Sequence, residues 1–226
     1  MTLLEDIAKS IEEGKIRRTK ELVKLAIEGG TNPRTVLNEG LLNGLRAVGK
    51  RFDRDNGMVS DMLVSARAIN ESMEILKPML LPVGRKPIGR CCIGTVRGDL
   101  HDVGKNIVKL MLESRGIEVI DLGVDVPPQD FVRAVTEDGC DLVCCSALLT
   151  ATMPEMQRVI RALKTAGVRE QVLVMVGGIP VTAAYAKRIG ADVYSADGFE
   201  AAEKAEKALL ALQKKREEAK EEKEDV

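Results

Sequence analysis

The hydrophobic pattern of this chain changes its period once, and that change limits the possible folds more than any other feature. From Leu3 to about residue 82, apolar residues recur at intervals of three and four, which is the helical spacing. The segment LPVGRKP, residues 81–87, contains two prolines and a glycine and interrupts the pattern. Beyond it, short apolar runs alternate with helix-capable stretches. The chain is therefore predicted to contain two units of different architecture.

The first unit, residues 1–82, is predicted to be a small antiparallel four-helix bundle. Two amphipathic helices are expected in LLEDIAKSIEEG and KIRRTKELVKLAIEGG, which both end at glycine. A third helix is expected to begin after Asn32, a favourable N-cap, with Pro33 at its first position. The fourth lies in MVSDMLVSARAINESMEILKPMLLP. Taken alone, this bundle indicates no function.

The second unit is predicted to be an α/β domain over residues 88–212, reached through a linker at 83–87. Its strands are expected in five apolar runs: 88–96, 117–122, 141–146, 172–176 and 191–194. Nearly continuous apolar strands that alternate with helices indicate a parallel sheet covered on both faces. We therefore expect a five-stranded flavodoxin-like or Rossmann-like sheet, followed by a charged tail over residues 213–226.

Composition limits the partners and the location. The formal net charge of −1 provides no basic field for nucleic acid. No apolar run approaches the ~20 residues of a membrane span, and the N-terminus lacks a signal-peptide core, so we expect a cytoplasmic protein without a membrane partner. The five cysteines are odd in number and lack the spacing of a zinc site. They are expected to be free thiols, four of them buried in strands.

Polar and glycine-rich segments follow the predicted strands, and the chain's only histidine lies in the first of them. The carboxyl ends of parallel strands meet at one edge of a sheet, where ligands bind in doubly wound folds. Small residues there would let a bulky ligand approach the backbone. The segments are GDLHDVG at 98–104, SALLT at 146–150, GGIP at 177–180 and SADG at 195–198.

Several chemistries are compatible with one histidine at such an edge, besides an ordinary loop residue without a task. A phosphate-binding loop is disfavoured because no G-x-G-x-x-G or Walker pattern occurs. A response regulator would need acids on neighbouring strand ends, where Ser146 and Gly177 stand instead. A cysteine nucleophile at Cys144 or Cys145 paired with His101 is conceivable, although these cysteines are expected inside a strand.

A histidine beside a carboxylate is also typical of a metal-ligating imidazole whose other ring nitrogen is hydrogen-bonded. Asp99 stands two residues before His101 and supplies that carboxylate. One protein ligand does not hold a free ion, but it can complete the coordination of a metal already held by a macrocycle.

The sequence resembles the corrinoid-binding signature. That signature reads D-x-H-x-x-G, then S-x-L about forty residues later, then G-G about thirty residues further on. Its residues here are Asp99, His101, Gly104, Ser146, Leu148, Gly177 and Gly178. With the preceding helices, the chain resembles the corrinoid proteins of methanol-type and methylamine-type methyltransferase systems, related to the cobalamin-binding module of methionine synthase. LRAVGKRFDRDNGMVSDMLVSARAINESMEILKP resembles that family's cap segment, with Ser60 and Asp61 where relatives usually carry Pro-Glu.

The resemblance implies a cobalamin or related corrinoid cofactor. It makes His101 the axial cobalt ligand, in place of the cofactor's own lower base, and Asp99 the acceptor for the other ring nitrogen. Gly104 would lie close to the displaced nucleotide tail, and Gly177 and Gly178 would line the slot that receives this tail. The remaining expected cofactor contacts are Asp102, Ser146, Leu148 and Thr150.

The resemblance also implies a function as a methyl carrier rather than a complete enzyme, with no catalytic residue of its own. A substrate:corrinoid methyltransferase would load the methyl group, and a second methyltransferase would pass it to coenzyme M or tetrahydrofolate. A reductive activation protein is a further expected partner. The alternative is a corrinoid-binding sensor, but sensors typically join the module to a DNA-binding or signalling domain, which we do not recognise here. The methyl donor is not indicated.

Overall fold

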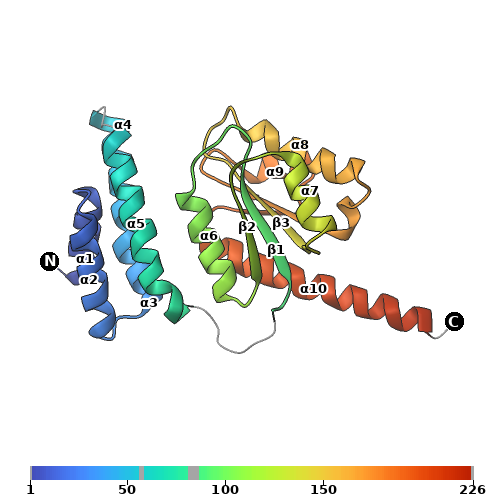
Figure 1. Cartoon of the computed structure of the whole chain (residues 1–226), viewed down its shortest axis with the longest axis horizontal. Helices are drawn as coiled ribbons and strands as arrows, with labels where there is room; N and C mark the ends of the chain where they lie inside the picture. The colour runs from blue at the N-terminus through green and yellow to red at the C-terminus, as the bar shows by residue number, and fades with distance from the viewer. Residues whose placement is uncertain (1, 56–58, 81–86, 225–226) are drawn as a thin grey trace. The chain divides into compact units, whose positions relative to one another are not determined.

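The computed structural model describes residues 2–55, 59–80 and 87–224, without the side chains of 51–60, 62 and 219–224. The chain divides into two compact units, Met1–Leu81 and Pro82–Val226 (Figure 1). Of the predicted linker at 83–87, only Pro87 belongs to the described residues. The side chain of Ser60, in the segment resembling a cap, lies outside them.

The first unit consists of four helical segments, as predicted, and the third of them is made of three consecutive elements, α3 (Pro33–Thr35), η1 (Val36–Leu42) and α4 (Asn43–Asp55). The third segment begins after Asn32, whose side chain accepts a hydrogen bond from the Arg34 backbone N–H at 2.9 Å. It runs without interruption through a π-helical part in its middle. The other elements are α1 (Leu3–Glu12), α2 (Ile16–Glu28) and α5 (Val59–Leu80).

Close helix contacts and buried hydroxyls hold this unit together. A Cβ atom at Gly44 would lie 2.7 Å from the carbonyl oxygen of Ala8, so only glycine lets α1 and α4 approach this closely. The buried hydroxyls of Ser10 and Thr19 lie 2.8 Å apart and share a hydrogen bond, and Ser65 donates to the Ile11 carbonyl at 2.7 Å. These polar groups are satisfied inside the bundle, as burial requires.

The second unit is a five-stranded sheet in the order β2-β1-β3-β4-β5, with every neighbouring pair parallel. This confirms the predicted fold class. The strands are β1 (Arg90–Val96), β2 (Glu118–Val126), β3 (Leu142–Ser146), β4 (Leu173–Gly177) and β5 (Val193–Ser195). The helical elements are α6 (Val103–Ser114), α7 (Pro128–Thr136), α8 (Met153–Thr165), the 3-10 helix η2 (Arg169–Gln171), α9 (Ala183–Ile189) and α10 (Gly198–Glu224).

Helices cover both faces of the sheet (Figure 1). On one face, α7, α8 and α9 pack on a core that includes Phe131, Met156 and Ile160. On the other, α6 and α10 pack together, and Met111 and Leu209 are buried. Within the described part of the chain, no helix is long and apolar enough to cross a membrane.

The five cysteines are free, as predicted, and Cys140 is buried together with the four that were expected in strands. Sulfur atoms of Cys91 and Cys144 lie 3.5 Å apart on neighbouring strands. Burial raises the pKa of the Cys91 and Cys145 thiols. Because the thiolate is the reactive form, this environment disfavours the cysteine-nucleophile alternative.

Helix α10 continues through residue 213, where the charged tail was expected to begin. The Gln213 side chain donates to the Ile88 carbonyl at 2.7 Å. Arg216 contacts the Asp141 carboxylate at 2.5 Å and the Gln171 carbonyl at 2.9 Å. The first part of the predicted tail is therefore attached to the amino edge of the sheet.

Candidate functional site

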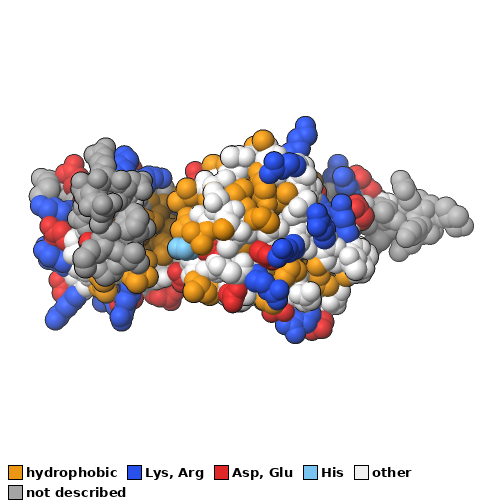
Figure 2. All heavy atoms as spheres, turned by 90° about the horizontal axis from the view of Figure 1, so that it is seen from above, with side chains coloured by type: hydrophobic (Ala, Val, Ile, Leu, Met, Phe, Trp, Pro, Cys, Tyr) orange, Lys and Arg blue, Asp and Glu red, His pale blue; other side chains and the backbone are white. Residues whose placement is uncertain are grey.

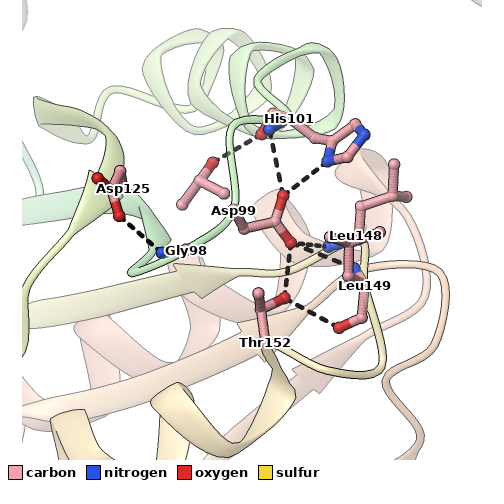
Figure 3. Close-up of polar contacts among 8 residues, drawn as sticks. Gly98, Asp99, His101, Asp125, Leu148, Leu149 and Thr152 are labelled. Atoms are coloured by element: carbon pink, nitrogen blue, oxygen red, sulfur yellow. Dashed lines mark hydrogen bonds and ion pairs between the residues drawn. The ribbon is translucent and has the colours of Figure 1, made fainter. Parts of the chain in front are cut away.

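Asp99 lies in the turn between β1 and α6, and its side chain is fully buried. One carboxylate oxygen accepts from the His101 backbone N–H at 3.2 Å and lies 2.7 Å from His101 Nδ1. The other accepts from the backbone N–H groups of Leu148 and Leu149, at 2.8 and 3.2 Å, and from the Thr152 hydroxyl at 2.7 Å (Figure 3). A single buried carboxylate thus connects the β1–α6 turn with the loop after β3.

These donors keep Asp99 ionised. Burial by itself raises the pKa of this carboxyl, but hydrogen bonds from His101, Thr152 and the Leu148 backbone outweigh it and lower the pKa to about 2. An ionised carboxylate only accepts hydrogen bonds, so the contact with His101 is made by an Nδ1–H group. The second ring nitrogen, Nε2, is then left without a contact to Asp99.

The His101 ring is held from one side and open on the other. Its side chain is 51% exposed, while Asp99 is completely covered. The Thr95 hydroxyl donates to the His101 carbonyl at 2.8 Å and fixes the backbone of His101. In Figure 3 the second ring nitrogen points away from Asp99. This is the orientation that a metal-binding imidazole with a carboxylate partner needs.

Large apolar side chains are exposed at the same edge of the sheet. Leu100 is 72% exposed and Ile179 87%, and Val124 and Leu149 are also exposed. They come from the turn after β1, the loops after β3 and β4, and the end of β2. Figure 2 shows hydrophobic side chains next to the histidine. Exposed apolar groups around one imidazole nitrogen fit the broad, largely apolar face of a macrocycle.

The two glycines after β4 serve close packing of the backbone. A Cβ atom at Gly178 would lie 1.9 Å from the Ala147 carbonyl oxygen, and its φ of +132° disfavours other residues. At Gly177 the corresponding distance to the Ser195 carbonyl oxygen is 3.2 Å. Ser146, half-buried, pairs with Gly177 across β3 and β4. The structure thus brings the predicted Ser-x-Leu and Gly-Gly segments together.

Two other predicted residues flank the start of α6. Gly104 is exposed, and a Cβ atom there would meet nothing within 4 Å, so its surface is open to a ligand. The Asp102 carboxylate accepts from the Asn106 side chain at 3.1 Å and is half-buried.

Sequence reasoning missed Thr152. The predicted hydroxyls, Ser146 and Thr150, were expected to contact the cofactor, and Thr150 is exposed. Thr152 is buried and its hydroxyl donates to Asp99. The available signal was a hydroxyl residue immediately before α8, where side chains often accept from the helix N-terminus. Leu148 contacts Asp99 through its backbone N–H and not through its side chain.

Comparisons with known proteins indicate cobalamin binding. A B12 binding domain family matches residues 89–206, and a second family with the same description matches residues 3–77. The chain is 39% identical over 205 residues to dimethylamine corrinoid protein 1 of Methanosarcina acetivorans, covering 88% of this chain and 96% of that one. It is 37% identical over 186 residues to trimethylamine corrinoid protein 1 of the same organism, covering 81% and 86%.

Two solved structures are similar as well. The monomethylamine corrinoid protein of Methanosarcina barkeri superposes with a TM-score of 0.83 at 30% identity, covering 89% of this chain and 96% of that one. A methanol:cobalamin methyltransferase complex of Methanosarcina barkeri gives a TM-score of 0.53 at 27% identity, covering 95% and 84%.

Proposed function

The chain belongs to the family of B12-binding corrinoid proteins, and from that membership we propose that it carries a methyl group between two methyltransferases. The observation that carries the proposal is the pairing of buried, ionised Asp99 with the exposed imidazole of His101 at 2.7 Å. When bound, the cobalt of a corrinoid supplies the chemistry, because it can accept a methyl group and release it.

The chain's own residues would hold and tune that cofactor. His101 would bind cobalt through Nε2, while Asp99 keeps the proton on Nδ1 and increases the basicity of the ligand. Thr152 and the Leu148 backbone hold the Asp99 carboxylate in place. Gly104, Asp102, Ser146, Leu148, Thr150 and the Gly177–Gly178 pair remain proposed contacts of the cofactor and its nucleotide tail.

The partners follow from the carrier role. A substrate:corrinoid methyltransferase would load the methyl group, and a corrinoid:acceptor methyltransferase would remove it. A solved neighbour described as a methanol:cobalamin methyltransferase complex supports a methyltransferase partner. We further propose a reductive activation protein and a cytoplasmic location. Relatives are named for monomethylamine, dimethylamine and trimethylamine, so donor choice is proposed to reside in the partner methyltransferase.

Reconstitution tests cofactor binding. The protein loaded with cobalamin should keep visible corrin absorption through gel filtration, at about one cofactor per chain. Because the sequence contains no tryptophan, that absorption should be conspicuous beside a weak protein band. Colourless protein after reconstitution under reducing conditions would overturn the proposal. Methyl transfer to a panel of methyltransferases and methylamine donors then identifies the partner.

Truncation tests the role of the two units. The signature residues all lie in residues 84–212, so this fragment should still bind corrinoid. The helical residues 1–80 are proposed to shield the upper face of the cofactor. Their removal should therefore accelerate oxidation of reduced cobalt. Equal oxidation rates in the full chain and the fragment would mean that the helices do not act as a cap.

A further inference from the structure

Strand β2 is longer and more irregular than its apolar run indicated. It extends to Val126, and its pairing with β1 shifts register twice, between Ile93 and Gly94 and between Gly94 and Val96. Asp121 pairs with Ile93, and Val126 pairs with Val96, so β2 advances by more residues than β1 over this stretch. Such bulges often re-aim side chains near functional sites.

Asp125 lies in the second irregularity and has an unusual backbone. Its φ of +54° makes it the one non-glycine residue with positive φ in the described part of the chain. This left-handed conformation is unfavourable for most residues, although aspartate and asparagine tolerate it better than others. Strained backbone of this kind persists where surrounding interactions fix it, often at functional sites.

Asp125 makes hydrogen bonds with the turn that precedes His101. Its carboxylate accepts from the Gly98 backbone N–H at 2.6 Å (Figure 3). Its own backbone N–H donates to the Asp99 carbonyl at 3.0 Å. One exposed residue of the edge strand therefore holds two successive residues of the turn, and the second of them carries the carboxylate that orients the imidazole.

We propose that Asp125 is a positioning residue for the cobalt ligand. By holding the Gly98–Asp99 turn, it sets where the Asp99 carboxylate stands and therefore how His101 presents Nε2. Thr95 also fixes this segment, through a hydrogen bond to the His101 carbonyl. The inference rests on the proposed function of His101 as axial ligand. Asp125 itself is exposed, so its role is distinct from core packing.

Two substitutions distinguish the effect of the Asp125 carboxylate from the effect of its backbone conformation. Asp125→Gly keeps the left-handed backbone but removes the acceptor, whereas Asp125→Asn keeps both the tolerance for this backbone and an acceptor oxygen. In the cofactor-free protein, hydrogen exchange of the Gly98 amide should become about tenfold faster in Asp125→Gly, as expected for loss of one hydrogen bond to a charged acceptor. In Asp125→Asn it should stay close to the wild-type rate.

The second readout uses protein reconstituted with cobalamin and labelled with ¹⁵N-histidine. The ratio of histidine-ligated to unligated divalent cobalt, measured by electron paramagnetic resonance, should fall about fivefold in Asp125→Gly and recover in Asp125→Asn. The reduction potential of the bound cobalt should likewise shift in Asp125→Gly and return close to the wild-type value in Asp125→Asn. A purely structural role would leave the potential and the ligation ratio unchanged.

Two results would overturn the inference: unchanged ligation and potential in Asp125→Gly, or an Asp125→Asn variant that behaves like Asp125→Gly. Failure of the proposed function looks different, because wild-type protein would then show no histidine splitting. The Gly98 exchange rates in the cofactor-free variants would still report whether Asp125 holds the turn.

Discussion

The two edges of the sheet differ in how their charged groups are paired. At the carboxyl edge, buried Asp99 accepts hydrogen bonds from its own turn, from the loop after β3 and from the residue before α8. At the amino edge, charged side chains pair with one another near the surface. Arg90 contacts Glu118 at 3.0 Å and the Asp138 carbonyl at 2.5 Å. Arg216 from α10 contacts Asp141 at 2.5 Å.

The difference between the two edges shows which of them is prepared for a ligand. At the amino edge the charged partners come from the protein itself, and exposed pairs of this kind stabilise little. At the carboxyl edge, a desolvated carboxylate orients an imidazole whose Nε2 has no hydrogen-bond partner among the described residues. An arrangement that buries one charge and leaves a neighbouring nitrogen available suits ligand binding better than stabilisation of the fold.

The largest effect is expected at Gly178. Substitution by alanine would place a Cβ atom 1.9 Å from the Ala147 carbonyl oxygen, and neither backbone can move away without disturbing the loops at this edge. We expect Gly178→Ala to lower the free energy of unfolding of the α/β unit by more than about 3 kcal/mol. Denaturation followed by tyrosine fluorescence measures this, because Tyr185 and Tyr194, the chain's only tyrosines, both lie in that unit.

Gly104→Ala is the matched control. Since nothing lies within 4 Å of the added methyl group, this variant should be as stable as wild type or more stable by about 0.5 kcal/mol. Its affinity for corrinoid should nevertheless fall, because the proposed nucleotide tail passes this surface. Equal losses of stability in both glycine variants would contradict the distinction between packing and ligand approach.

The next effect is the acid dependence of stability. Because the pKa of Asp99 is lowered to about 2 from an ordinary value of 3.8, its ionised form stabilises the folded state at higher pH. That contribution, about 2 kcal/mol, should be lost as the pH falls from about 4 to about 2. The advantage of wild type over Asp99→Asn in unfolding experiments should shrink over this range. An advantage that stays constant with pH would show that the carboxylate is not held in its charged form.

A smaller effect is expected for the hydroxyl that reaches Asp99. Thr152→Val removes a donor to a buried charge at 2.7 Å and should lower the free energy of unfolding by about 1.5 kcal/mol. Thr150→Val, at an exposed position on the same loop, should change it by less than about 0.5 kcal/mol. The reverse order in these two unfolding free energies would show that the Thr152 hydroxyl does not stabilise the buried Asp99 carboxylate.

The smallest effect is expected at the amino edge. Arg216→Ala removes a partly exposed ion pair with Asp141 and should change the free energy of unfolding by less than about 1 kcal/mol. Corrinoid affinity and cobalt potential should not change, because this contact lies at the opposite edge of the sheet. A shift in either property would show that the two edges of the sheet are coupled.

Sequence periodicity predicted the fold well because it reflects burial, which is a property of whole segments. The strand expected at 141–146 is β3, Leu142–Ser146, and the fourth-strand expectation at 172–176 is β4, Leu173–Gly177. The spacing of Asp99 and His101 likewise predicted their contact. The strand expected at 117–122 continues to Val126, since its register shifts place exposed and polar residues inside the strand.

The parts of the site that were not predicted depend on single hydrogen bonds. Thr150 and Thr152 are chemically alike, and only the path of the loop before α8 brings Thr152 to Asp99. The contact between Asp125 and Gly98 depends on a left-handed backbone in an irregular strand, which periodicity does not reveal. The backbone donor at Leu148 is independent of its side chain.

Electron paramagnetic resonance of the divalent cobalt state can show whether His101 is the axial ligand of cobalt. Because His101 is the chain's only histidine, ¹⁵N-histidine labelling marks one imidazole alone. We expect a nitrogen hyperfine splitting that changes with the isotope in wild type and disappears in His101→Ala, while part of the corrinoid binding persists. A hyperfine pattern that is the same in wild type and His101→Ala would contradict this expectation, since another base would then hold the cobalt.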